Sequence, residues 1–319
     1  MRRVLARRLA VALPLLFVVS VLTFVLERLA PGDPVDTILG HQAFGGGGGT
    51  SAQYVELRAK LGLNHPLWIQ YWDWLREALH GNLGASIFSG EPVTSAIDTR
   101  LPVTLSLILG SVLLSAVVGI AIGVFGAVRG GRVARSLDAV ALVGFAIPSF
   151  WLGLLLIELL AVKASLLPAT GYVDLRSSFG GWTRSLVLPV LSLGVGGIAL
   201  VARQTRDAML EALQRDFIRN LRANGFSERS IIFKHALKNA AIPVVTVLGL
   251  LTVGLLSGSV AIETVFALPG LGSLAVSATS QHDTPVVQGV VLYFALIVIG
   301  VNLALDITYG WLNPKARAD

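Results

Sequence analysis

Residues 207–243 read DAMLEALQRDFIRNLRANGFSERSIIFKHALKNAAIP, a long polar segment between two strongly apolar ones. Four of its apolar residues recur at every fourth position, which predicts one stripe of an amphipathic helix: Met209, Leu213, Phe217 and Leu221. The segment therefore begins as a helix that buries one face and leaves the other in water.

The end of this helix is predicted at Asn224-Gly225, because glycine accepts the left-handed backbone that a helix end requires. Ser227 can then cap a second short helix, and Phe226 and Ile231 are spaced to staple its start. Basic residues gather in this segment, as they do on the cytoplasmic side of membrane proteins. The sequence thus predicts a rigid helix–glycine–helix corner that offers a docking surface to a cytoplasmic partner.

The composition excludes an ordinary soluble domain. Of the 319 residues, 54% are apolar and only 14% are charged, whereas soluble domains carry roughly 25% charged residues. Six apolar runs have the roughly 20 residues that are needed to cross about 30 Å of hydrocarbon. These predicted spans cover residues 9–28, 103–128, 138–162, 186–202, 242–262 and 286–308. The predicted fold is all-α, a polytopic membrane protein with six transmembrane helices.

The first apolar run has an alternative interpretation as a secretory signal peptide, because four arginines precede it: Arg2, Arg3, Arg7 and Arg8. A membrane span is favoured, since the run is longer than a typical signal core. No clear small-x-small cleavage site follows it either. The arginines are then interpreted as cytoplasmic flanking charges.

The distribution of basic residues predicts the orientation. With the N-terminus in the cytoplasm, 17 of the 25 lysines and arginines fall in cytoplasmic segments, eight of them between Arg203 and Lys238. The net charge of +6 is therefore a signature of topology and not of nucleic-acid binding. The chain has no cysteine, which excludes disulfides, thiolate metal sites and cysteine nucleophiles.

Residues 30–100 form the one large outer region in this topology, and segments 54–61 and 66–79 are predicted to be helical. In the second segment four apolar side chains share one face and two further rings flank it: Trp68, Trp72, Leu75, Leu79, Tyr71 and Trp74. Because such rings favour the headgroup zone, this helix either lies on the outer membrane surface or packs on its own protein. The glycine run at 45–49 is a flexible tether.

Candidate pathway residues lie in and between the spans. Pro148 interrupts the third span, either lining a pathway or, by default, making a structural kink. The outer loop at 263–285 holds a proline- and glycine-rich stretch that suggests a re-entrant or tightly turned cap over the outer mouth. Its candidate gate residues are Phe266, Pro269 and Gly270.

Two acidic residues fall inside predicted spans, where ionisable groups are costly. Glu158 and Asp306 could each line a water-filled pathway, but reaching the interface or pairing with a basic neighbour is the favoured interpretation. The five histidines are scattered, and His235 is more readily explained by capping or packing than by proton transfer. No phosphate-binding P-loop, H-E-x-x-H or G-x-S-x-G motif occurs, so the sequence predicts no catalytic site, no metal site and no nucleotide site.

The segment 207–243 resembles the cytoplasmic coupling loop, or EAA loop, of ABC-importer permeases. The form it resembles most is that of the B-type subunit in the dipeptide/oligopeptide/nickel class, with matching residues at Gly225, His235, Leu237, Asn239 and Pro243. Further matches run along nearly the whole chain: Leu29–Pro34, Leu61-Gly-Leu63, Gln70-Tyr71, Leu101-Pro102, Ile147–Phe150, Phe266–Gly272 and Asn313-Pro314. Asn220 and Leu221 replace two usually small residues, and the glycine run is not part of the family pattern.

The resemblance implies a type I ABC-importer permease fold with an outer helical subdomain. The implied division is an N-terminal helix at 1–29, an extracytoplasmic subdomain at 30–100, a permease core at 101–309 with its coupling loop at 203–240, and a tail at 310–319. The residues expected to contact an ATPase are Arg219, Arg222, Ala223, Asn224, Gly225, Phe226, Ser227, Glu228 and His235. In the family this corner seats in a groove of the ATP-binding subunit, whose closure on ATP rocks the helices behind it.

The implied function is a permease subunit that forms half of a translocation path for short peptides. The expected partners are a homologous second permease, two ATP-binding subunits or a fused pair, an extracytoplasmic binding protein and the lipid bilayer. This chain would bind no cofactor, since ATP and Mg²⁺ belong to the partners. The expected location is the bacterial cytoplasmic membrane, with both termini in the cytoplasm. Nickel, glutathione or another small solute is the alternative cargo.

A different functional class, the ion-driven secondary transporter, is the second hypothesis. A secondary transporter would contain paired intramembrane charges or broken helices in inverted halves, and a channel would contain a selectivity filter. None of these patterns is evident in the sequence. A membrane scaffold without transport activity would leave the coupling corner and the pathway prolines without a role.

Overall fold

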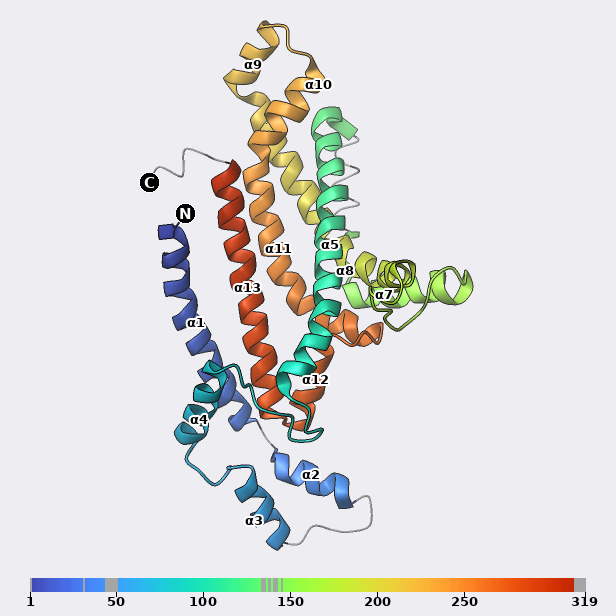
Figure 1. Cartoon of the computed structure of the whole chain (residues 1–319). Coiled ribbons are helices and arrows are strands. Elements are labelled where there is room, and N and C mark those ends of the chain that lie inside the picture. Colours follow the sequence, from blue (N-terminus) through green and yellow to red (C-terminus); the bar gives the residue numbers. More distant parts are fainter. Residues whose placement is uncertain are drawn as a thin grey trace. The chain divides into compact units, whose positions relative to one another are not determined.

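The computed structural model describes residues 2–30, 32–43, 51–132, 136, 139, 143–144 and 146–312. Apart from one isolated β-bridge, the regular elements of this part of the chain are helices (Figure 1). They begin with α1 Arg2–Leu29, α2 Pro34–Ala43, α3 Ser51–Lys60, α4 Leu67–Leu79, α5 Val93–Arg129, α7 Ser149–Leu156 and the π-helix η1 Ile157–Lys163. They continue with α8 Phe179–Gln214, α9 Asp216–Ala223, α10 Glu228–Ser230, the π-helix η2 Ile231–Ala236, α11 Leu237–Val265, α12 Leu271–Gln281 and α13 Thr284–Leu312. The predicted all-α fold is confirmed.

Five helical segments in the described part are long and apolar enough to cross a membrane: Ala10–Leu29, Val93–Arg129, Phe179–Gln214, Glu228–Val265 and Thr284–Leu312. They contain most or all of predicted spans one, two, four, five and six. The third predicted span, 138–162, lies partly outside the described residues and is seen from Ser149 onward as α7 and η1. The count of six spans therefore stays a prediction. The glycine run at 45–49 and Asn313-Pro314 also lie outside the described residues.

The internal contacts divide the chain into two compact units. The first comprises Val103–Pro269 and the described residues from Gly300 onward. The second comprises Arg2–Pro102 and Gly270–Ile299. The helices α5 and α13 each contribute one part to both units.

In the first unit, α5 and α8 meet through small residues. The helix α5 carries a G-x-x-x-G pair, Gly119 and Gly123, and a Cβ placed on Gly123 would lie 2.5 Å from the carbonyl oxygen of Ala202 on α8. One turn before this pair, the hydroxyl of Ser115 donates a hydrogen bond of 3.0 Å to the carbonyl of Gly194 on α8. Small residues let membrane helices pack backbone against backbone. We call this contact the α5–α8 seam.

The helix α11 packs along α8 on one side and contacts the C-terminal part of α13. Gly249 of α11 faces the side chain of Leu305, which leaves no room for a Cβ at that position. The hydroxyl of Tyr309 donates to the hydroxyl of Thr246 at 2.8 Å. Small residues and one polar pair thus join these two apolar helices.

The second unit has its own apolar cluster, built from α12, the first turns of α5 and α13, and Leu83 in the segment before α5. Its buried members are Leu83, Val93, Ile97, Leu271, Ala278, Val286, Val287 and Val290. The helix α12 corrects the prediction of an outer loop across 263–285. Leu271, Leu274, Ala275 and Ala278 recur at helical spacing and pack in or against the cluster, which favours a helix after the Pro269-Gly270 turn.

Polar contacts in the second unit fix the segments between its helices. Asp283 accepts hydrogen bonds from the Ser86 hydroxyl at 2.5 Å and from the Ile87 N–H at 3.2 Å. Asp33 links α2 to α3, because it accepts from the Tyr54 hydroxyl at 2.7 Å and from Arg58 at 2.6 Å. Partial burial opposes ionisation of Asp33, but these hydrogen bonds and the charge of Arg58 outweigh it and hold the pKa of Asp33 below its usual range.

Candidate functional site

The predicted amphipathic helix of the coupling segment is in fact two helices. The helix α8 ends at Gln214, Arg215 has an extended backbone with ψ 148°, and α9 begins at Asp216. An acidic residue in the first turn stabilises a helix start, which favours this restart. The predicted apolar stripe is therefore divided between the two helices, and the prediction of a single helix from 207 to 223 was wrong.

The glycine corner ends α9 with two characteristic hydrogen bonds. The N–H of Phe226 donates to the carbonyl of Leu221 at 3.1 Å, and the N–H of Gly225 donates to the carbonyl of Arg222 at 3.0 Å. Gly225 has φ +77°, the left-handed conformation that the sequence predicted. Together these bonds form a Schellman motif, which satisfies carbonyls left free at the helix end. The backbone of the corner is thus fixed by its own hydrogen bonds.

The chain leaves the corner through Ser227, whose side chain accepts a 3.4 Å hydrogen bond from the Ser230 N–H. The predicted cap is therefore present. The prediction of a separate second short helix was wrong, because α10 continues through η2 directly into α11. The corner is joined to a membrane helix without an intervening loop on this side.

An ion pair connects the two sides of the corner. The Nε of Arg222 lies 2.7 Å from Oε1 of Glu228, and its Nη2 lies 3.3 Å from Oε2. The hydrogen bond from Arg222 holds the pKa of Glu228 below its usual range, against a smaller opposing effect of desolvation. Both side chains are exposed, so the pair contributes to local order more than to global stability.

This ion pair gives the corner a predictable pH dependence. Because the pKa of Glu228 is lower in the folded than in the unfolded state, the stabilisation is present above the unfolded value and is lost as the pH falls through the folded value. We expect a nitroxide on Ala223→Cys to stay ordered at neutral pH and to gain mobility only on acidification below the usual glutamate range. Glu228→Gln should make the label mobile at every pH. A label equally mobile in both backgrounds would contradict this role of the pair.

Behind the corner lies a buried apolar cluster, which we call the buttress. Its fully or nearly buried members come from α5, α8, α9, η2 and α11: Val124, Ala127, Ala208, Met209, Ala212, Ile218, Ile231, Ala236 and Ala240. In contrast, every residue from Arg222 to Arg229 is exposed. The corner is therefore a solvent-exposed projection on a packed base that reaches three long helices.

His235 lies at the base of this projection. Its ring meets the ring of Phe226 edge to face at 5.8 Å, and its carbonyl accepts from the Asn239 side chain at 2.9 Å. The half-exposed Phe226 is thus held against the helix that follows it. These contacts match the packing interpretation of His235.

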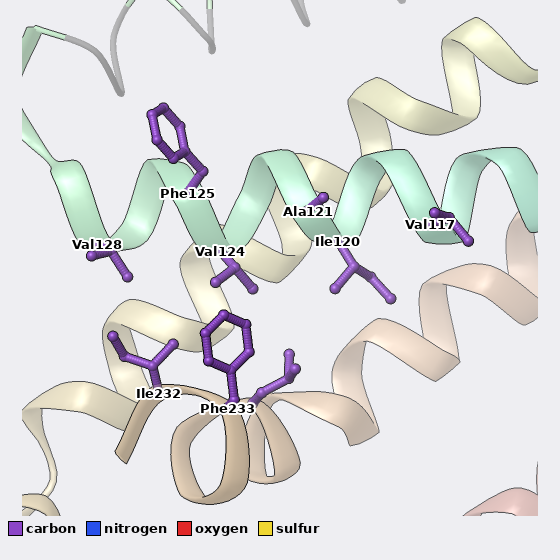
Figure 2. Close-up of a pocket in the computed structure, with 9 residues that line it drawn as sticks. Val117, Ile120, Ala121, Val124, Phe125, Val128, Ile232 and Phe233 are labelled. Carbon is purple, nitrogen blue, oxygen red and sulfur yellow. The ribbon is translucent and has the colours of Figure 1, made fainter. Parts of the chain in front are cut away.

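An apolar groove of about 470 Å³ runs beside the buttress. Figure 2 shows Ile120 and Val124 of α5 pointing toward η2, from which Ile232 and Phe233 point back. All of its lining side chains are apolar: Val117, Ile120, Ala121, Val124, Phe125, Val128, Ile232, Phe233 and Leu237. Since its lining side chains offer no charge or hydrogen-bonding group, the groove does not have the features of a peptide or ion site.

The pathway candidates lie on elements other than those that form the corner. Pro148 precedes the first turn of α7, so it begins a helix there. Glu158 is exposed on η1, and its Oε1 lies 3.3 Å from Nζ of Lys163, which matches the interpretation of pairing with a basic neighbour. Phe266 is 1% exposed, and its carbonyl accepts from the Gly171 N–H at 2.9 Å.

The other three pathway candidates have different environments. Pro269 is exposed, Gly270 is the buried N-cap residue of α12, and Asp306 is half-buried on α13. Glu158 and Asp306, the two ionisable candidates, lie on different helices, η1 and α13. Within the described residues, no group of three histidine or acidic side chains is placed to hold a metal ion.

Glu263 is a buried carboxyl that sequence reasoning missed. It is fully buried near the end of α11 and accepts a 2.7 Å hydrogen bond from the hydroxyl of Thr104, which is also fully buried. The predicted fifth span ends at residue 262, so Glu263 falls in the loop predicted after it. The signal available in the sequence was an acidic residue directly after a predicted span, three residues before the candidate gate residue Phe266. Its partner, 159 residues away in sequence, could not be inferred locally.

We expect this pair to contribute measurably to stability. Loss of a buried hydrogen-bonding partner costs about 1–3 kcal/mol, so Glu263→Ala should lower the melting temperature in detergent. Glu263→Gln, which keeps an acceptor oxygen, should lower it less. Thr104→Val and Glu263→Ala should be non-additive when combined, because both remove the same contact. Strictly additive effects would show that the two side chains do not depend on each other.

Residues 119–318 match the family described as "binding-protein-dependent transport system inner membrane component", and residues 1–108 match its N-terminal companion. A putative peptide transport system permease protein from Brucella abortus is 40% identical over 321 residues, with full coverage of both chains. The di/tripeptide transport system permease protein of Pseudomonas aeruginosa is 39% identical, covering 98% of each. A glutathione transport system permease protein from Escherichia coli is also 39% identical, covering 98% of this chain and 97% of its own.

A similar fold occurs among solved structures. An inward-facing structure of the MetNI methionine ABC transporter aligns with a TM-score of 0.54 and 20% identity, covering 69% of this chain and 97% of the other. The resemblance to ABC-importer permeases is thereby confirmed for the fold, and the family matches extend it to the sequence. The chain therefore belongs to the family of binding-protein-dependent transport system inner membrane components, and it is a multi-pass permease subunit, not the ATP-hydrolysing subunit.

Proposed function

We propose that this chain forms half of the translocation path of an ATP-driven importer of short peptides and couples that path to ATPase partners through the corner at Gly225. The observation that carries this proposal is the exposed, hydrogen-bonded corner on its packed base. A partner that moves the corner also moves α9 and η2, which contact α8, α11 and each other. A displacement at the corner therefore reaches the membrane helices.

The contact surface for the ATPase comprises the exposed corner and the residues that hold it: Arg219, Arg222, Ala223, Asn224, Gly225, Phe226, Ser227, Glu228 and His235. Arg219 and Asp216 form a second exposed ion pair beside it, at 3.2 Å. ATP and Mg²⁺ would be bound by two ATP-binding subunits or a fused pair. In this arrangement the corner, both termini and the end of α5 at Arg129 are cytoplasmic.

The proposed path requires a second, homologous permease, because this chain would supply only half of its wall. Residues 30–100 would face the extracytoplasmic binding protein that delivers substrate. Pro148, Phe266, Pro269, Gly270 and Asp306 are retained as candidate path or gate residues. Glu158 is the weakest pathway candidate, because it already pairs with Lys163.

Short peptides are the proposed cargo because relatives that align over nearly their full length are named for peptide, di/tripeptide or glutathione transport. Glutathione is itself a modified tripeptide, so these names share one chemistry. Nickel or another small solute is the alternative. The binding protein, a separate chain, would set most of this selectivity.

A gentle detergent pull-down of the tagged chain from its native membrane tests the proposal. We expect a related permease, ATPases and an extracytoplasmic binding protein to co-purify. The reconstituted complex should take up labelled di- or tripeptides only with ATP. Recovery of the chain alone, from a preparation shown to preserve complexes, would contradict the coupling role. Recovery of the complex with uptake of a different solute would overturn only the cargo.

A further inference from the structure

The helix α4 has a wider apolar arc than its own chain covers. Trp74 and Ala78 pack against the apolar cluster of the second unit. On the adjoining side of the helix, Trp68, Trp72 and Leu79 are 72%, 63% and 79% exposed. Positions 68, 72 and 79 are separated by one and two helical turns, so these side chains form one continuous stripe. An exposed apolar stripe of this kind implies that an apolar environment outside the chain covers it.

The position of α4 indicates what that surrounding is. The hydroxyls of Tyr71 on α4 and Ser20 on α1 share a 2.8 Å hydrogen bond, and the Tyr71 ring meets the rings of Phe17 and Phe24 at 6.2 and 5.5 Å. Figure 1 shows α4 beside the C-terminal part of α1. Ser20 lies nine residues before the end of the membrane span Ala10–Leu29, which is about 13 Å along a helix axis. The hydrocarbon layer is about 30 Å thick, so the contact lies at a depth that lipid chains occupy.

The remaining side of α4 is polar and marks the boundary with water. Asp73, Arg76 and Glu77 are exposed, and Glu77 accepts a hydrogen bond from the Asn82 side chain at 3.0 Å. Near the start of α4, Gln70 accepts from Arg28 at the end of the α1 span at 2.8 Å. A helix with one protein face, one aromatic apolar stripe and one charged side matches the interface between hydrocarbon and water.

We propose that α4 is an interfacial helix embedded in the lipid leaflet at the C-terminal end of α1, with Trp68, Trp72 and Leu79 in contact with acyl chains. Lipid is favoured over a docked protein because α1 itself exposes apolar side chains such as Leu22 and Leu26, at 54% and 65%, along the same span. A surface continuous with a membrane span is wetted by lipid without any partner. The inference depends on α1 as a span and not on the nature of the cargo.

Site-directed spin labelling tests this proposal, because the chain has no native cysteine and a single introduced thiol is unique. Trp68→Cys, Trp72→Cys and Leu79→Cys would carry nitroxides, with Glu77→Cys on the polar side of the same helix as the matched control. The full chain would be placed in vesicles of phosphatidylethanolamine and phosphatidylglycerol. Accessibility to oxygen, which concentrates in hydrocarbon, would be compared with accessibility to a water-soluble nickel chelate.

We expect severalfold lower nickel accessibility at positions 68, 72 and 79 than at 77, together with high oxygen accessibility. Equal nickel accessibility at all four positions would place the stripe in water and overturn the proposal. Exclusion of both reagents from the stripe would also overturn it, since a protein surface would then be the cover. Loss of oxygen access when the binding protein is added to the assembled complex would likewise contradict lipid as the occupant.

A second measurement does not depend on the cysteine variants. Brominated acyl chains should quench part of the native tryptophan fluorescence of the unsubstituted chain. The double variant W68F/W72F should lose most of the quenchable fraction that α4 contributes. An unchanged quenched fraction in this variant would show that neither indole meets lipid. Aromatic replacement keeps the stripe apolar, so the helix itself should be retained.

Discussion

Substrate uptake should fall to background when Gly225 is replaced by tryptophan, although the helices should still insert in the membrane. Two effects combine at this position. Gly225 has φ +77°, and an L-residue in a left-handed conformation costs about 1–2 kcal/mol. In addition, no heavy atom lies within 4 Å of a Cβ placed there, so the indole would project into solvent. In the proposed complex, that space is where the ATPase docks.

Asparagine at the same position separates these two effects. It tolerates the left-handed region better than other non-glycine residues, and its side chain is small. We therefore expect Gly225→Asn to retain more of the uptake than Gly225→Trp. Pull-down of the ATPase from each variant, with a protease protection assay for topology, checks the mechanism. Full uptake and full ATPase recovery with tryptophan would show that the corner is not the coupling surface.

The second large effect is expected at the α5–α8 seam, where Gly123→Leu should prevent the first unit from packing. A Cβ at this position would lie 2.5 Å from the carbonyl oxygen of Ala202 and 2.6 Å from Cβ of Thr205. Neither obstacle can rotate away, because one is backbone and the other is attached directly to it. Overpacking ordinarily costs about 1–3 kcal/mol and occasionally more, and a backbone obstacle places this case at the upper end.

Size-exclusion chromatography in mild detergent, together with the melting temperature of the eluted protein, measures this effect. The matched control is Gly254→Leu in α11, where a Cβ meets nothing within 4 Å. That variant should elute and melt like the unsubstituted chain. Similar elution and melting of the two leucine variants would show that close approach at the seam is not required.

The sequence predicted the features that depend on neighbouring residues. Gly225 and Ser227 carry their own conformational signals, so the corner and its cap were expected. Long apolar runs likewise predicted the membrane helices, although the structure extends them beyond the membrane-spanning length. Local signals were insufficient at Arg215, where a charged residue with ordinary helix propensity adopts an extended backbone between two helices. There, packing of Met209 and Ile218 in the buttress favours the break.

Contacts between distant segments account for the other differences. The burial of Glu263 against Thr104 depends on the alignment of α5 and α11, which no local pattern encodes. Likewise, α12 packs against residues of α5 and α13 that are distant in sequence. The local pattern after Pro269-Gly270 was therefore not enough to predict this helix. For α4, the sequence left two environments open. In the structure, one side of α4 packs on the protein and the adjoining apolar side is exposed.

The α5–α8 seam also has a mechanical consequence. Gly119 and Gly123 contribute no side-chain torsions, and a Cβ placed on them would lie 3.0 and 2.5 Å from backbone carbonyl oxygens of α8, so backbone packs against backbone there. Close-packed protein interiors have low compressibility and transmit strain. The two helices should therefore behave as a single stiff lever, which carries a torque applied at the end of α8 along its length with little loss.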